Sequence, residues 1–133
     1  MLVAELMQTD VETVAVDTAV HDALVTLAES RVSALPVVDG AGRLVGVISR
    51  TDILASEEEA DDEAAREALL SGTLVRDLMT SPVLTITPDA NVREAAQQML
   101  ATGVHRLFVT SGEAMVGVIS ITDIVRAVAT GRL

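Results

Sequence analysis

The feature that most constrains the fold of this chain is an internal repeat. Displacing the 133-residue sequence by 72 residues aligns Leu6-Met7 with Leu78-Met79. Beyond a glycine-containing turn the displacement falls to 71, and GVISRTDI at 46–53 then aligns with GVISITDI at 117–124. A one-residue deletion is readily tolerated at a surface turn. The chain therefore contains a duplicated unit of about 55 residues, and its fold must be built from two similar parts.

Each unit is predicted to have the element order β-α-β-β-α, preceded by a short helix. Apolar residues recur at i, i+3, i+4, i+7 and i+8 from Val20 and again from Val92, which predicts two amphipathic helices. The other predicted elements are short helices over Val3–Met7 and Val75–Met79, strands over Thr13–Val16, Leu35–Val38, Leu44–Ser49, Val83–Thr87, Leu107–Thr110 and Met115–Ser120, and final helices starting near Thr51 and Thr122.

Turn and cap signals support these elements. The run Asp39-Gly40-Ala41-Gly42 indicates a hairpin, and Asn91 followed by Glu94 resembles a capping-box helix start. The fold class is therefore α/β, in the α+β sense. Because neither small sheet could bury its apolar face alone, we expect the units to pack sheet against sheet or helix against helix.

The domain organisation follows from the repeat. We expect one repeat over 1–56, an acidic helical linker over 57–72 and a second repeat over 73–133. Residues 57–67 carry seven acidic residues and one Arg, which is −6 of the net charge of −11. No EF-hand spacing is present there, so we predict a spacer and no metal site.

Composition excludes several classes of partner. The chain has nine Arg, no Lys and twenty acidic residues, which argues against nucleic acids and anionic membrane surfaces. It has no Cys, no basic segment before its first apolar residues, and no apolar run long enough for a membrane helix. We expect a soluble cytoplasmic protein.

Catalytic motifs are missing from the sequence. A Walker A motif needs a Lys, and neither a G-x-S-x-G elbow nor H-E-x-x-H occurs. The glycines between 40 and 46 lie between two predicted strands instead of opening a helix, which does not fit a dinucleotide-binding fingerprint. With no evident pair of nucleophile and base, we predict no catalytic residues and no enzymatic activity.

The doubled segments Gly46–Asp52 and Gly117–Asp123 are the strongest functional signal. Each runs from the end of a predicted strand into the start of a helix, where hydroxyl and backbone N–H groups can bind an anion. A carboxylate one turn later can accept hydrogen bonds from vicinal hydroxyls, such as those of a ribose. Ser, Thr and Asp at a helix start are also common N-caps, so a structural role is the competing interpretation.

These segments, together with Leu35-Pro36-Val37-Val38-Asp39 and the glycine-rich turn, closely resemble the cystathionine-β-synthase (CBS) domain. Two in tandem resemble a CBS pair, or Bateman module. The resemblance implies a pseudo-two-fold pair with its sheets packed together and two clefts between the repeats. It also implies an adenosine-containing regulatory ligand, such as AMP, ADP, ATP or S-adenosylmethionine, a disc-like homodimer, and a separate regulated protein partner.

The resemblance also implies roles for individual residues. Asp52 and Asp123 would hold ribose hydroxyls, with Ser49, Thr51, Ser120 and Thr122 near the phosphates. The adenine would meet the backbone of Thr13, Val14, Ala15, Thr85, Ile86 and Thr87, and the apolar side chains of Val47 and Val118.

The two clefts are not expected to be equivalent. The second repeat has His105-Arg106 where the first has Ser33-Ala34. The resemblance implies that this pair reaches a phosphate whose ribose is held by the other repeat, and the donors of Arg and His suit a phosphate. We therefore expect one stronger site that combines Ser49, Thr51 and Asp52 with His105 and Arg106. Arg50 is either an additional cation of that site or a solvated residue. The opposite cleft, with Ser120, Thr122 and Asp123, is expected to be weak or empty.

Phe108, the one aromatic residue, replaces the Pro of the first repeat. It is expected in the core, with a cleft or a dimer contact as alternatives.

The sequence thus predicts a regulatory CBS pair that binds an adenosine-containing ligand and requires no further cofactor. Two alternatives stay open. One is a dimerising scaffold of the same fold without a ligand, and the other is a small enzyme that uses Asp52 or Asp123 as a general base.

Overall fold

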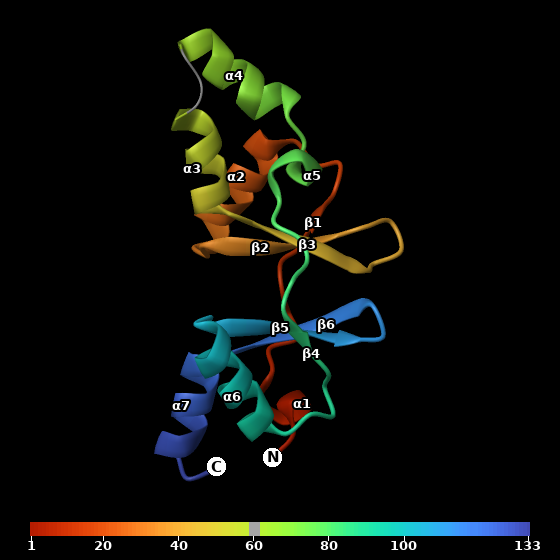
Figure 1. The fold of residues 1–133 in the computed structure, drawn as a ribbon, viewed down its shortest axis with the longest axis vertical. Coiled ribbons are helices and arrows are strands. Elements are labelled where there is room, and N and C mark those ends of the chain that lie inside the picture. Colours follow the sequence, from red (N-terminus) through yellow and green to blue (C-terminus); the bar gives the residue numbers. More distant parts are fainter. Residues whose placement is uncertain (59–61) are drawn as a thin grey trace. The chain divides into compact units, whose positions relative to one another are not determined.

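The computed structural model describes residues 1–58 and 62–133, which form two compact units (Figure 1). One unit comprises Glu12–Val83 and is called the central unit. The other joins Met1–Val11 to Leu84–Leu133 and is called the terminal unit. Each unit contains a three-stranded sheet of the same topology, with helices on one face of the sheet (Figure 1).

The central unit follows the predicted order of elements. Its sheet has the strand order β1-β2-β3, in which β1 runs parallel to β2 and β2 pairs antiparallel with β3. Its elements are β1 (Val14–Ala15), α2 (Val20–Ser30), β2 (Ala34–Val38), β3 (Leu44–Ser49), α3 (Arg50–Glu58), α4 (Glu63–Gly72) and α5 (Val75–Leu78).

The terminal unit repeats this arrangement in the order β4-β5-β6, with the same parallel and antiparallel pairings. Its elements are α1 (Val3–Leu6), β4 (Thr85–Ile86), α6 (Val92–Thr102), β5 (Arg106–Ser111), β6 (Ala114–Ser120) and α7 (Ile121–Ala129). The predicted order β-α-β-β-α, with a short helix before it, is confirmed in both repeats.

The short helix that opens each sequence repeat does not pack with the rest of its own repeat. It packs in the unit that contains most of the other repeat. Val3 of α1 is 0% exposed within the core of the terminal unit, and its N–H donates to the carbonyl of Ala90 at 2.8 Å. Val75 of α5 lies in the core of the central unit and donates to the carbonyl of Thr18, also at 2.8 Å. The compact units are therefore not the same segments as the sequence repeats.

Two glycines allow the segments that follow α1 and α5 to cross the sheets. Thr80 and Val47 exchange two backbone hydrogen bonds of 2.8 and 3.0 Å, and Gln8 and Val118 exchange two of 2.8 and 2.9 Å. A Cβ on Gly46 would lie 2.6 Å from Sδ of Met79, and one on Gly117 would lie 2.8 Å from the carbonyl oxygen of Gln8. Glycine at these two positions leaves room for the close approach of the crossing segments.

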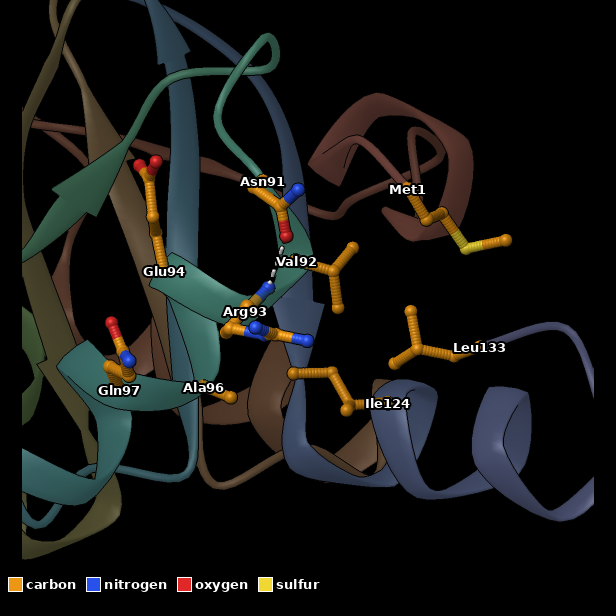
Figure 2. A pocket seen from close by; sticks show the side chains of 9 residues that line it. All are labelled: Met1, Asn91, Val92, Arg93, Glu94, Ala96, Gln97, Ile124 and Leu133. Carbon is orange, nitrogen blue, oxygen red and sulfur yellow. Dashed lines mark hydrogen bonds between the residues drawn. The ribbon is translucent and has the colours of Figure 1, made fainter.

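The predicted capping box at the start of α6 is corrected in one detail. Asn91 is the N-cap, as its position suggested, but its Oδ1 accepts from the N–H of Arg93 at 2.8 Å and not from that of Glu94 (Figure 2). An Asn side chain can cap the second helical N–H as well as the third.

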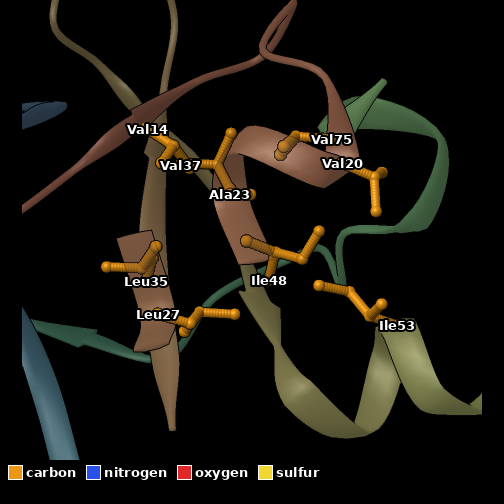
Figure 3. Packing of buried hydrophobic residues seen from close by; sticks show 9 residues of the cluster. All are labelled: Val14, Val20, Ala23, Leu27, Leu35, Val37, Ile48, Ile53 and Val75. Atoms are coloured by element: carbon orange, nitrogen blue, oxygen red, sulfur yellow. The ribbon is translucent and has the colours of Figure 1, made fainter. Parts of the chain in front are cut away.

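Each core lies between one face of a sheet and its helices. In the central unit, Leu35, Val37 and Ile48 of the sheet pack against Leu27 of α2 and Ile53 of α3 (Figure 3). In the terminal unit, Leu107, Val109 and Ile119 occupy the corresponding positions. Side chains alternate between the faces of a strand, so the intervening residues project from the face away from this core.

Phe108 is one of these intervening residues. It pairs with Val118 across the sheet and is 6% exposed, so it is buried as expected, but on the face opposite Leu107 and Val109.

The predicted linker is helical where it is described. Glu63–Gly72 forms α4, Asp62 caps it by accepting from the N–H of Ala65 at 2.8 Å, and Leu70 packs against the core of the central unit. Residues 59–61 of the predicted linker lie outside the described residues. In the described part of the chain, none of the helices has the length and apolar character needed to cross a membrane.

Candidate functional site

The first doubled segment ends in a closed ring of hydrogen bonds at the start of α3. The N–H of Ser49 donates to Oδ2 of Asp52 at 2.9 Å, and the N–H of Asp52 donates to Oγ of Ser49 at 3.1 Å. This reciprocal arrangement is a capping box, with Asp in the third helical position. The structural interpretation of Ser49 and Asp52 is therefore confirmed, while Oδ1 of Asp52 points out of the ring.

The second doubled segment forms the same ring at the start of α7. Ser120 N–H donates to Oδ2 of Asp123 at 2.9 Å, and Asp123 N–H donates to Oγ of Ser120 at 3.1 Å. The duplication thus preserves the local geometry to within 0.1 Å for both bonds. The two capping rings are thus alike, and the two carboxylates differ in what contacts their second oxygen.

Two residues that the sequence interpretation missed supply that contact. Thr80 Oγ1 donates to Oδ1 of Asp52 at 3.3 Å in the central unit. Gln8 Nε2 donates to Oδ1 of Asp123 at 3.1 Å in the terminal unit. The signal was present in the sequence, because Gln8 and Thr80 align at the displacement of 72, but they lie outside the doubled motif.

The candidate ligand-contacting side chains share a face of each sheet. Val47 and Ser49 alternate with the core residue Ile48, and Val118 and Ser120 alternate with the core residue Ile119. All four are partly exposed. They therefore project from the face that the core of their own unit does not use.

Arg106 belongs to this face as well. It opens β5 opposite Ser120 in the antiparallel register, and paired residues of neighbouring strands point to the same side of a sheet. The side chains of His105 and Arg106 are exposed, as are those of Arg50, Thr51 and Thr122 at the helix starts. The carbonyl of His105 accepts from the N–H of Ile121 at 2.9 Å, which ties the start of β5 to the start of α7.

The segments predicted to meet adenine lie on the edge strands β1 and β4. Val14 and Ile86 point into the cores, so their side chains are not available to a ligand. Their neighbours are exposed: Thr13, Ala15, Thr85 and Thr87. Contact with adenine through the backbone, as the resemblance implied, is compatible with this placement.

The structure brings together Ser49 with Asp52 and Ser120 with Asp123, each within one unit. Ser49, Thr51 and Asp52 belong to the central unit, and His105 and Arg106 belong to the terminal unit. Their predicted combination in one site stays a proposal.

A separate cavity of about 600 Å³ lies within the terminal unit (Figure 2). Its lining comes from the start of α6, from α7 and from the two ends of the chain: Asn91, Val92, Arg93, Glu94, Ala96, Gln97, Ile124, Met1 and Leu133. None of the residues predicted to bind a ligand is among its lining residues. Over residues 1–58 and 62–133, no group of three or more His, Asp or Glu is arranged to hold a metal ion.

Comparison with known proteins identifies the family. The model of the CBS domain matches twice, over residues 3–59 and 75–130. This protein belongs to the CBS domain family and contains two tandem CBS domains.

Two curated relatives match this chain over part of their own length. The chain is 34% identical over 139 aligned positions to the CBS domain-containing protein CBSX1, chloroplastic, of Arabidopsis thaliana, covering 89% of this chain and 59% of the relative. It is 32% identical over 123 positions to inosine-5′-monophosphate dehydrogenase of Methanocaldococcus jannaschii, covering 92% of this chain but 22% of that protein. The chain thus spans less than two thirds of the length of either relative.

A solved structure matches over nearly the whole of both chains. The crystal structure of CBSX2 in complex with AMP is 32% identical and superposes with a TM-score of 0.83, covering 99% of this chain and 98% of that one. The predicted α/β fold of a tandem CBS pair is confirmed.

Proposed function

We propose that this protein is a regulatory CBS pair that binds an adenosine-containing ligand and passes the signal to a partner. The observation that carries the proposal is the match over 99% of the chain to a CBS pair crystallised with AMP. The local geometry supports it, because both units place a capped aspartate beside a sheet face that their own core leaves unused.

The ribose is assigned to Asp52. Its Oδ2 is engaged in capping α3, whereas its Oδ1 accepts only one bond of 3.3 Å that the structure records. A carboxylate oxygen can accept more than one hydrogen bond, so vicinal hydroxyls can bind there without breaking the cap. Asp123 is the corresponding residue of the second site.

The phosphate is assigned to His105 and Arg106, with Ser49, Thr51 and the cation of Arg50. An Arg side chain offers a planar fork of donors that matches a phosphate, and an acidic chain needs local positive charge to hold an anion. That these residues serve the same ligand as Asp52 is taken from the resemblance to the family. Ser120 and Thr122 would serve the second site. The adenine is assigned to the backbone at Thr13–Ala15 and Thr85–Thr87, beside Val47 and Val118.

A ligand screen tests the proposal as a whole. Thermal unfolding would be followed with an added dye, because the chain has no Trp or Tyr. The panel contains AMP, ADP, ATP, S-adenosylmethionine and NAD. A ligand at about 100 times its Kd adds about 2.7 kcal/mol to the free energy of unfolding, which raises Tm by roughly 4 °C or more for a domain of this size.

A selective rise in Tm with an adenosine-containing compound is the expected result. A flat response of folded protein that carries no co-purified nucleotide would contradict the proposal and favour the ligand-free scaffold.

The phosphate assignment has its own test. Arg106→Ala should weaken AMP binding by about tenfold to a hundredfold, the value of a hydrogen bond between charged groups, and leave adenosine binding nearly unchanged. Arg66→Ala removes an exposed cation of α4 and serves as the control. Equal losses for AMP and adenosine would refute a phosphate contact.

Self-association is proposed as part of the regulatory role. The helices of the terminal unit leave Leu100 79%, Val125 59% and Val128 57% exposed. We propose that these residues contribute to a homodimer, since exposed apolar side chains on neighbouring helices are stabilised by a partner surface. Light scattering of the wild type and of Val125→Asp would show a dimer and a monomer, respectively; a monomeric wild type at high concentration would contradict this.

We propose no catalytic reaction for this chain. The match to inosine-5′-monophosphate dehydrogenase spans 22% of that enzyme, so its activity is not carried over. Turnover of a bound nucleotide, measured by chromatography after incubation, would instead support the general-base alternative at Asp52 or Asp123.

A further inference from the structure

The two capped aspartates differ in the group that contacts their second carboxylate oxygen. Oδ1 of Asp123 accepts from the Gln8 amide at 3.1 Å and lies 3.9 Å from Nη1 of Arg126. Oδ1 of Asp52 accepts from the Thr80 hydroxyl at 3.3 Å, and alignment places Ala55 where the second repeat has Arg126. Asp123 is 8% exposed, and Asp52 is more open.

The chemistry of the two contacts is unequal. A carboxylate only accepts hydrogen bonds, so the amide nitrogen of Gln8, which only donates, must be the atom that faces Asp123. Because Asp123 is 8% exposed and its Oδ1 already faces both Gln8 and Arg126, little of that oxygen is open, and a ribose hydroxyl would have to displace the Gln8 amide. The Thr80 hydroxyl both donates and accepts and can rotate about its bond, so it can remain beside Asp52 when a ribose hydroxyl arrives.

The position of Gln8 is fixed by its backbone. Its N–H and carbonyl form the two hydrogen bonds to Val118 across Gly117, and α1 anchors the segment through Val3 in the core. These backbone hydrogen bonds place the Gln8 side chain beside Asp123, and they would form whatever side chain residue 8 carried. Thr80 is delivered to Asp52 by the equivalent bridge to Val47.

We propose that Gln8 occupies the ribose position of the second site, so that Asp52 accepts a nucleoside ribose and Asp123 does not. The side chains of Gln8 and Thr80 then decide how many adenosine ligands the chain binds. This inference rests on the proposed function, and it assigns an occupancy-determining role to two residues outside the doubled motif.

Reciprocal exchange of the two side chains tests the inference. Titration calorimetry with AMP should give one tight site per wild-type chain. Gln8→Thr should add a second site, with affinity for AMP at Asp123 raised by about tenfold or more, the value of one displaced hydrogen bond to a charged group. Thr80→Gln should weaken the Asp52 site by a similar factor.

Two controls connect the result to the ribose and to folding. Titration with 2′-deoxy-AMP should remove the site gained in Gln8→Thr, because one of the vicinal hydroxyls is missing. Gln97→Ala, which changes an exposed glutamine of α6, should leave the stoichiometry at one. Gln8→Thr should unfold at nearly the wild-type temperature, since the backbone bridge to Val118 is retained.

The outcomes separate this inference from the function on which it rests. A wild type that binds two AMP molecules, or a Gln8→Thr variant that still binds one, overturns the role of Gln8 while leaving the sensor intact. A wild type and variants that bind neither AMP nor adenosine overturn the proposed function and this inference with it.

Discussion

Gly46 and Gly117 leave space for a neighbouring segment of the chain. At the other described glycines an added Cβ would have no neighbour within 4 Å. A Cβ at Gly117 would lie 2.8 Å from the carbonyl oxygen of Gln8. One at Gly46 would lie 2.6 Å from Sδ of the Met79 side chain, and its nearest backbone atom, the carbonyl oxygen of Thr80, would be farther away at 3.1 Å. Backbone yields less readily than a methionine side chain. The two repeats should therefore differ in how they tolerate an added methyl group.

We expect Gly117→Ala to lower the free energy of unfolding by about 1–3 kcal/mol, and Gly46→Ala to lower it by less, because overpacking costs more where neither partner can move. Chemical denaturation followed by circular dichroism measures both. Gly40→Ala is the control, since a Cβ there has no neighbour within 4 Å. Equal stability of all three variants would show that the tight contacts at Gly46 and Gly117 do not affect the free energy of unfolding.

Asp39 provides a pH-dependent test at the hairpin between β2 and β3. The backbone N–H of Arg43, followed by that of Ala41 and the Arg43 guanidinium, holds the pKa of the Asp39 carboxyl below its ordinary value. A pKa lowered by folding stabilises the folded state above the unfolded pKa, and this contribution is lost as pH falls through the folded pKa.

The stability difference between wild type and Asp39→Asn should therefore be present at neutral pH and shrink below about pH 4, where an unperturbed aspartate protonates. Thermal unfolding from neutral pH into acid would measure it. A difference that grew on acidification would have the wrong sign for this account.

At the scale of elements, reciprocal hydrogen bonds between a serine and an aspartate cap the starts of α3 and α7. Loss of an N-cap typically costs about 1 kcal/mol. Ser120→Ala should therefore destabilise the protein by about that amount, measured by denaturant unfolding. Ser111→Ala, at the exposed end of β5, should have little effect. No loss of stability in Ser120→Ala would indicate that the observed ring of bonds does not stabilise the helix start.

The elements themselves were largely predictable from the sequence, and the physical reason is local. Apolar periodicity predicted α2 and α6, and the glycine-rich turn predicted the hairpin of β2 and β3. The capping bond of Asn91 was misassigned by one residue, because Arg93 and Glu94 both offer an N–H within reach of a short side chain.

The contacts of the second carboxylate oxygens could not be predicted in this way. Gln8 and Asp123 are 115 residues apart, and only the fold brings them together. Likewise, nothing in the pattern of Val3–Met7 distinguishes docking on its own repeat from docking on the other. The doubled motif was recognised, but Gln8 and Thr80, which contact its two aspartates differently, lie outside it.

At the scale of the whole molecule, each short helix packs in the unit that holds most of the other sequence repeat. This placement predicts which unit loses stability when a short helix is mutated. Val3 precedes the central unit in sequence but is fully buried in the terminal unit, whereas Val75 is buried in the central unit. Val3→Ala should cost about 2 kcal/mol through the cavity it leaves. Hydrogen exchange should then increase over 84–133 more than over 12–83.

Val75→Ala is the matched variant and should show the reverse pattern. If Val3→Ala instead accelerated hydrogen exchange mainly over 12–83, α1 would be packed in the central unit, and each repeat would fold as one contiguous segment.

Calorimetric titration of AMP into Asp52→Asn examines whether this carboxylate binds the ribose of an adenosine-containing ligand, as we propose. Asparagine can still accept the Ser49 N–H and preserve the cap, while the charge that attracts the hydroxyls is lost. Asp77→Asn is the control, because Asp77 accepts the Leu74 N–H in the same local geometry within the same unit. The account predicts at least tenfold weaker AMP binding in Asp52→Asn and wild-type binding in Asp77→Asn. Undiminished binding in a folded Asp52→Asn variant would contradict it.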